Sequence, residues 1–127
     1  MKTAYVDTSC LLAVALAEPG AGRVAQGLER FDQRFSSNLL EAELRSALMR
    51  EEQTREPVEL FSRITWVFPS RPLTREFRAV LSYGYVKGAD LWHIACALFL
   101  SPDPHEITFL TLDQRQKQIA SRLGFPT

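Results

Sequence analysis

The sequence is poor in cysteine and histidine, and these shortages exclude several kinds of site. Among its 127 residues there are two cysteines, Cys10 and Cys96, and two histidines. The cysteines lie far apart and form no CxxC pair, so neither a disulfide framework nor a zinc site is expected. Both fall in apolar stretches, which predicts small buried side chains in a protein of the reducing cytoplasm.

An excess of charge of either sign is also missing. Fifteen lysines and arginines balance fifteen aspartates and glutamates, so the formal net charge is zero. The chain as a whole therefore attracts nucleic acid or anionic membranes only weakly, and such binding must use a local patch. Most of the basic residues are arginine, a bias that permits a partner bearing phosphate or carboxylate.

Long apolar runs are absent from the sequence. None approaches the about 20 residues that are needed to span a bilayer. The run CLLAVALA with the triplet Ala15-Leu16-Ala17 imitates a short secretory signal. Asp7 cancels the charge of Lys2, however, and the apolar run is close to the minimum length. We therefore expect a cytoplasmic protein that does not contact a membrane.

What the sequence does contain is an alternation of short strands and helices, expected to form a single domain over residues 1–127. The predicted strands are 2–6, 34–37, 64–68 and 107–112. The predicted helices are 10–17, 21–31, a long one capped by Ser36 or Ser37 and ending near Glu52, a brief one after Pro57, 74–83 with Thr74 as N-cap, 89–100, and 114–123 before Gly124. This order predicts an α/β fold with a mainly parallel central sheet flanked by helices on both faces.

Four acidic residues stand where such a sheet would present groups to a ligand. Asp7 follows the first strand and Asp113 follows the last, and the carboxyl ends of parallel strands form the edge where ligands bind. Asp90 stands at the start of the most apolar helix, and Glu43 lies inside the long helix. Each aspartate is also a good helix N-cap, so none of the three is informative alone.

Glu43 is the informative acid because Glu41 serves as an internal control. Glu41 precedes Arg45 by four residues, which is the spacing of an ordinary solvent-side ion pair. Glu43 instead shares a helix face with Leu44, where an unpaired charge is costly. His93 is the one basic residue in the stretches expected to be buried. A divalent cation held by several carboxylates would remove the difficulty, since Mg²⁺ prefers oxygen ligands.

Four motifs, taken in order, resemble those of PIN-domain proteins and specifically VapC-type toxin ribonucleases. They are YVDTS, AEL within the long helix, GADLWHIACAL and TLDQRQKQIASRLGF. The resemblance covers essentially the whole chain, and four motifs in order are far more specific than any one of them. It implies a PIN-like fold whose acidic positions are Asp7, Glu43, Asp90 and Asp113.

Three further residues belong to the same motifs. Ser9 matches the family's small hydroxyl residue two places after the first acid, and Thr111 matches the one two places before the last. His93 lies one turn beyond Asp90, and two interpretations of it stay open. It is either a partner that orients a carboxylate or a histidine satisfied within a packed helix.

The resemblance implies an endoribonuclease that hydrolyses RNA phosphodiester bonds with Mg²⁺ or Mn²⁺. Asp7 and Asp90 would be direct metal ligands, while Glu43 and Asp113 would bind through water, complete a second metal site or orient the attacking water. The family also implies a homodimer and a small antitoxin protein that blocks the acidic pocket. Because such a pocket repels RNA, a basic rim is required. Its candidates are Arg45, Arg50, Lys87, Arg115 and Lys117.

Other classes of protein are weighed against this one. The nearest is a PIN nuclease of RNA processing outside toxin systems, and a PIN fold used only for binding would be favoured by a broken acid set. A Mg²⁺-binding receiver-like signalling domain wants adjacent acids after the first strand, whereas Thr8 and Ser9 follow Asp7. A haloacid-dehalogenase-like phosphatase needs D-x-D there, and position 9 is serine.

Overall fold

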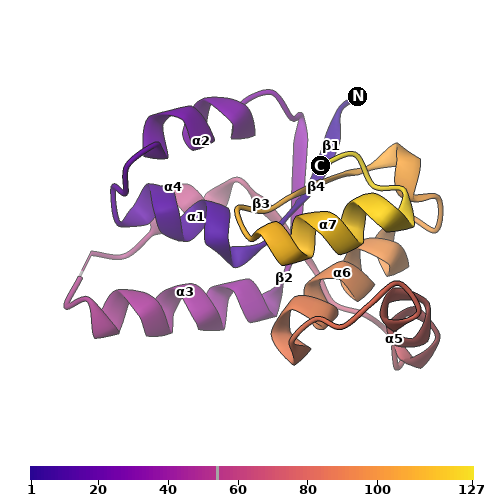
Figure 1. Ribbon diagram of the computed structural model, residues 1–127. Coiled ribbons are helices and arrows are strands. Elements are labelled where there is room, and N and C mark those ends of the chain that lie inside the picture. Colours follow the sequence, from indigo (N-terminus) through magenta and orange to yellow (C-terminus); the bar gives the residue numbers. More distant parts are fainter. Residues whose placement is uncertain (54) are drawn as a thin grey trace.

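The computed structural model describes residues 1–53 and 55–127, and within these ranges the chain forms four strands and seven α-helices (Figure 1). The strands are β1 (Thr3–Val6), β2 (Gln33–Ser37), β3 (Ile64–Val67) and β4 (Thr108–Leu110). The helices are α1 (Thr8–Ala15), α2 (Ala21–Leu28), α3 (Asn38–Arg50), α4 (Val58–Ser62), α5 (Thr74–Leu81), α6 (Gly88–Leu100) and α7 (Gln114–Leu123), and a 3₁₀ turn, η1 (Pro104–Glu106), precedes β4.

The strands form one parallel sheet in the order β3-β2-β1-β4. The chain steps from β1 to β2 to β3 in one direction, and β4 then pairs on the other side of β1. The strand order therefore reverses between β1 and β4, and in open α/β sheets the crevice beyond the carboxyl ends at such a point is where ligands bind.

Helices cover both faces of this sheet, as the alternating pattern predicted. Neighbouring residues of β1 point to opposite faces, so Tyr5 and Val6 belong to different clusters of buried side chains. Tyr5 packs with residues of α5, α6 and α7, whereas Val6 packs with residues of α1, α2, α3 and α4. Figure 1 shows the first four helices on one side and the last three on the other. The predicted α/β fold class is confirmed.

Two predicted boundaries differ from the structure for local reasons. The last strand was expected to reach residue 112, but β4 ends at Leu110, where its pairing partner Val6 is the last residue of β1. The prediction that Thr74 is an N-cap is wrong. Leu73 takes that position because its carbonyl accepts the first helical hydrogen bond, from the amide of Phe77 (2.8 Å).

The predicted burial of the two cysteines is confirmed. Cys10 packs on the α1 side of the sheet and Cys96 lies in α6, and both are buried free thiols. Among the helices that the structure describes, none is both long and apolar enough to cross a membrane. Even α6, whose residues His93 to Ala97 are all buried, spans only 13 residues.

Candidate active site

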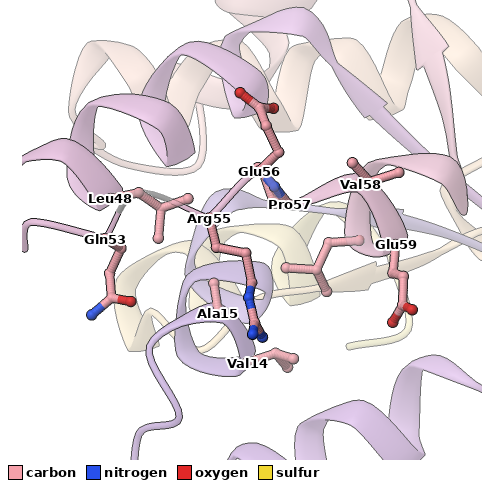
Figure 2. A pocket seen from close by; sticks show the side chains of 10 residues that line it. Val14, Ala15, Leu48, Gln53, Arg55, Glu56, Pro57, Val58 and Glu59 are labelled. Carbon is pink, nitrogen blue, oxygen red and sulfur yellow. The ribbon is translucent and has the colours of Figure 1, made fainter.

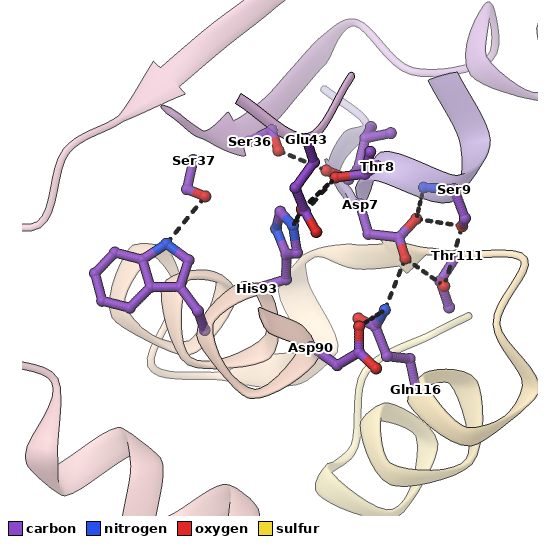
Figure 3. Close-up of polar contacts among 12 residues, drawn as sticks. Asp7, Thr8, Ser9, Ser36, Ser37, Glu43, Asp90, His93, Thr111 and Gln116 are labelled. Carbon is purple, nitrogen blue, oxygen red and sulfur yellow. Dashed lines mark hydrogen bonds and ion pairs between the residues drawn. The ribbon is translucent and has the colours of Figure 1, made fainter. Parts of the chain in front are cut away.

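All four predicted acids line one cavity of about 280 Å³ at the carboxyl ends of β1 and β4. Its walls are formed by Asp7, Thr8, Ser9, Leu12, Glu43, Asp90, His93, Asp113 and Gln116. Residues from α1, α3, α6 and α7, which are far apart in the sequence, therefore meet where the strand order reverses. Their catalytic roles stay predictions, but their common location is observed, and Figure 3 shows three of them, Asp7, Glu43 and Asp90.

Asp7 is the most buried of these carboxylates and is held by hydrogen bonds. It ends β1 and caps α1, accepting from the backbone N of Ser9 (3.1 Å) and from its hydroxyl (2.6 Å). The hydroxyl of Thr111 (2.6 Å) and Nε2 of Gln116 (2.8 Å) donate to its second oxygen. Burial raises the pKa of Asp7, an effect that the hydroxyl donors oppose.

Asp90 lies in the first turn of α6, but the N-cap of this helix is Lys87. A position inside the helix leaves the carboxylate of Asp90 free to turn toward the cavity, where Oδ1 accepts a hydrogen bond from Nε2 of Gln116 (3.0 Å). Burial, followed by the negative charges of Asp113 and Asp7, raises the pKa of Asp90. Repulsion among these acids is the condition that a bound cation relieves.

Asp113 does cap a helix, as its position in the sequence indicated. Its Oδ1 accepts from the backbone N of Gln116 (2.8 Å) at the start of α7, and its own N–H donates to the hydroxyl of Thr111 (3.0 Å). The same carboxylate lines the cavity, so capping and a place in the site coexist in one residue.

Two side-chain donors bind the same carboxylate oxygen of Glu43. Its Oε1 accepts from the hydroxyl of Thr8 (2.7 Å) and from Nε2 of His93 (2.9 Å). The hydrogen bond from His93 lowers the pKa of Glu43, which outweighs the opposing effect of partial burial. Glu41, the internal control, pairs with Arg45 (2.8 Å) as predicted.

The hydrogen bonds around His93 assign its tautomer. The carboxylate of Glu43 can only accept, so Nε2 of His93 is the donor of this pair. Nδ1 of His93 lies 2.8 Å from the hydroxyl of Tyr5, which also accepts from the backbone N of Ser37 (3.1 Å). Burial raises the pKa of Tyr5, which stays neutral. His93 is thus packed in the core and also orients a carboxylate, and that carboxylate is Glu43.

Gln116 is one of the cavity residues that sequence reasoning missed, together with Thr8 and Leu12. It is only 2% exposed, and its Nε2 bridges Asp7 and Asp90. The available signal was its position three residues after Asp113, which is the spacing of a capping box. Instead of reaching back to the cap, its side chain turns into the cavity (Figure 3).

Two of the predicted rim residues are engaged elsewhere. Arg45 pairs with Glu41 and also with Glu56 (3.0 Å), and Arg50 lies 3.6 Å from Glu51. Neither arginine is among the residues that line the acidic cavity. Their ion pairs hold both arginines against acids outside the cavity, and their assignment to the rim stays a prediction.

The other three rim candidates lie near Asp90 and Asp113 in the sequence. Lys87 is exposed at the N-cap of α6, three residues before Asp90. Arg115 and Lys117 lie in the first turns of α7, where they line a shallow depression next to Asp113. Arg115 also donates to the backbone oxygen of Tyr85 (2.9 Å), which ties this part of α7 to the loop before α6.

A larger cavity, of about 630 Å³, lies at the other ends of α1 and α3 (Figure 2). Val14, Ala15 and Leu48 give it an apolar floor. Figure 2 shows the carboxylates of Glu56 and Glu59 pointing apart, so they do not converge on a common point. Its size does not make it the better candidate for chemistry, because catalysis needs polar groups that converge.

The donor chemistry of the acidic cavity fits a hydrated divalent cation. Carboxylates are the oxygen ligands that Mg²⁺ and Mn²⁺ prefer, and the buried Oε1 of Gln116 has no partner among the described residues. In the same part of the chain, no three His, Cys, Asp or Glu side chains are placed to hold one metal together. The site therefore suits an ion that takes one or two protein carboxylates and keeps its waters.

Fold and site together define an α/β protein with a carboxylate-lined pocket, an arrangement suited to metal-dependent hydrolysis of phosphate esters. The PIN domain family model matches residues 4–122, so the chain belongs to the PIN domain family. PIN domains are generally metal-dependent nucleases and usually use Mg²⁺ or Mn²⁺. Among curated proteins, no significant match to this chain is found.

Proposed function

We propose that this protein is a Mg²⁺- or Mn²⁺-dependent endoribonuclease that acts as the toxin of a VapBC-type pair. The observation that carries the proposal is the meeting of Asp7, Glu43, Asp90 and Asp113 at one cavity of a PIN-family fold. Helix capping accounts for Asp7 and Asp113 but not for Glu43 and Asp90. A shared phosphodiester-hydrolysing site accounts for all of them.

The metal would be held by Asp7 and Asp90, where it would activate a water and polarise the scissile phosphate. Ser9 and Thr111 keep the Asp7 carboxylate in one orientation, since each donates to a different oxygen of it. Glu43 is kept ionised by His93 and faces the same cavity, so it is placed to accept a proton from the attacking water. Asp113 adds negative charge to the same cavity.

RNA must approach this acidic cavity along basic side chains. Lys87 precedes the helix that carries Asp90, while Arg115 and Lys117 follow Asp113, so both sides of the cavity have a positive charge nearby. Contacts of this kind bind phosphates without reading bases, and they weaken as salt is added. We therefore expect RNA binding that depends strongly on ionic strength.

The toxin assignment rests on the resemblance of four motifs to those of VapC-type proteins. It includes a cytoplasmic location, a homodimer and a small antitoxin that covers the acidic cavity with a basic side chain. Such a side chain would neutralise the repulsion that adds to burial in raising the pKa of Asp90.

Incubation of the purified protein with transfer, ribosomal and messenger RNA tests the nuclease, with single-stranded DNA as the comparison. We expect discrete RNA fragments with Mg²⁺ or Mn²⁺, none with EDTA, and recovery when excess metal is restored. Cleavage that persists in EDTA would contradict a metal-dependent mechanism.

Controlled expression in a bacterial host tests the toxin role separately. Induction should arrest growth, and coexpression of a small protein encoded beside this one should restore it. If the protein cuts RNA in vitro but leaves growth unchanged, it is a PIN nuclease of another kind, such as one of RNA processing.

A further inference from the structure

The carboxylate of Asp7 has no lone pair left for a cation in the structure as it stands. A carboxylate offers about four lone-pair sites on its two oxygens. Within the described residues, Oδ1 accepts from the N and Oγ of Ser9, and Oδ2 accepts from Oγ1 of Thr111 and Nε2 of Gln116. For a metal to bind Asp7, one of these four donors must give way.

Three of the four donors are tied to the backbone. The N–H of Ser9 belongs to the first turn of α1. The hydroxyl of Ser9 also accepts from the backbone N of Leu112 (2.9 Å). The hydroxyl of Thr111 accepts from the backbone N of Asp113 (3.0 Å). These second bonds hold both hydroxyls in place, so their release would disrupt the junction between β4 and α7.

The amide of Gln116 is held differently. Its Nε2 donates one proton to Asp7 (2.8 Å) and the other to Asp90 (3.0 Å). Its Oε1 is buried and has no partner among the described residues. The amide group is therefore fixed by the two carboxylates alone, and its unpartnered oxygen already carries a desolvation penalty. Of the four donors, it is the one that can turn away.

We propose that Gln116 is a positioning residue that occupies the cation's place between Asp7 and Asp90 in the metal-free protein. The cation then binds by displacing the Gln116 amide. This inference rests on the proposed function, because it concerns the same metal site. The physical reason is competition for the same two oxygens. A Mg²⁺ ion at about 2.1 Å from them would meet the positive N–H groups of the amide.

Two groups that compete for one place oppose each other's binding, and the coupling is reciprocal. Removal of the amide leaves Asp7 and Asp90 repelling each other without a donor between them. Removal of the amide therefore destabilises the metal-free state and leaves the stability of the metal-bound state unchanged. The variant consequently binds the cation more tightly than the wild type. Coupling between two binding events typically changes an affinity by about 5- to 150-fold. We expect a change in Mn²⁺ affinity near the lower end of this range.

Calorimetric titration of the full chain with Mn²⁺, without RNA, tests this. The variants are Gln116→Ala and Gln116→Met, the latter keeping the side-chain volume if the alanine variant folds poorly. Gln118→Ala is the matched control, an exposed glutamine of the same helix. We expect both Gln116 variants to lower the Kd for Mn²⁺ about fivefold or more and to increase the Mn²⁺-induced rise in Tm. The control should match the wild type.

Weaker Mn²⁺ binding in the Gln116 variants would overturn the inference, because the amide would then assist the cation instead of competing with it. Unchanged affinity would overturn it too and leave Gln116 a purely structural residue. In both cases wild-type Mn²⁺ binding would leave the proposed function intact. If the wild type bound no Mn²⁺, the metal dependence of the proposed function would fail and the inference with it.

Discussion

Nε2 of His93 lies 2.9 Å from Oε1 of Glu43, at the end of a hydrogen-bond chain that starts at the backbone of Ser37 and passes through Tyr5. This pair explains how a helix carries an acid beside its apolar face. The carboxylate accepts a hydrogen bond from the imidazole of His93 before any metal binds. Glu43 is therefore preorganised at the cavity in the metal-free protein.

Replacement of Glu43 by glutamine should abolish most RNA cleavage while the protein stays folded. The amide oxygen of Gln can still accept from His93, so the local packing is retained, but the group can no longer take a proton. Loss of a general base typically costs about 10²-fold or more in rate. Single-turnover cleavage of a fixed RNA substrate measures the effect.

Glu41→Gln is the matched control for that variant, because Glu41 lies two residues away on the same helix and pairs with Arg45 outside the cavity. Its cleavage rate should equal that of the wild type. Equal losses in both variants would show that helix α3, and not the Glu43 carboxylate, is what the reaction depends on.

Replacement of Tyr5 by phenylalanine should destabilise the fold. The hydroxyl of Tyr5 is buried and serves both the N–H of Ser37 and Nδ1 of His93. Its removal leaves two buried polar atoms without a partner, which costs about 1–3 kcal/mol. Urea unfolding measures the change in the free energy of unfolding.

Tyr85→Phe controls for the loss of a hydroxyl as such, since Tyr85 is 72% exposed. Substitutions at exposed positions usually stay within about 0.5 kcal/mol of the wild type. If Tyr5→Phe were equally mild, the buried chain from Ser37 to Glu43 would contribute nothing measurable, and its role in orienting His93 would have to be abandoned.

In the metal-free protein, the stability of Asp7→Asn relative to the wild type should increase as the pH rises. Burial raises the pKa of Asp7 above its ordinary value of 3.8. The folded state thus holds this proton more tightly than the unfolded state, so stability falls as pH rises from about the unfolded value through the raised one. Asparagine does not ionise, so the variant does not lose this stability as the pH rises. Thermal unfolding in EDTA between about pH 4 and pH 8 gives the difference in Tm between variant and wild type.

Added Mg²⁺ should reverse that trend at the upper end of the pH range. A cation favours the ionised form of Asp7, so it should raise the Tm of the wild type and leave Asp7→Asn nearly unchanged. A Tm difference in EDTA that stays constant or shrinks with rising pH would mean that Asp7 is not destabilised by its burial.

The fold was predictable because its signals are local. Strands alternate with helices, and the apolar stretches of β1 and α6 are easily recognised in the sequence. These two features predicted the order of the elements and the parallel sheet. The position of Asp7 and Asp113 at strand ends predicted that they would meet. Strand lengths were less predictable, since β4 stops where its partner β1 stops, which depends on pairing between segments about 100 residues apart.

The contacts inside the site were harder to predict because they depend on side-chain direction. Nothing in the sequence shows that Gln116 turns into the cavity instead of toward the cap at Asp113. The sequence likewise identified His93 as the one available basic partner of Glu43 but favoured a cation in that place. Arg45 was assigned to the rim by proximity in sequence, whereas its position on α3 directs it to Glu41 and Glu56.

We propose that Asp7, which follows β1, and Asp90, in the first turn of α6, make this protein a metal-dependent ribonuclease. The most direct test compares RNA cleavage with Mn²⁺ by the wild type, Asp7→Asn and Asp90→Asn, with the exposed Asp32→Asn as the control. The account predicts that the wild type and Asp32→Asn cut alike, while the two cavity variants fall to the background of RNA incubated without enzyme. If the cavity variants cut as fast as the wild type, the cleavage belongs to a contaminant and the acidic cavity is not a nuclease site.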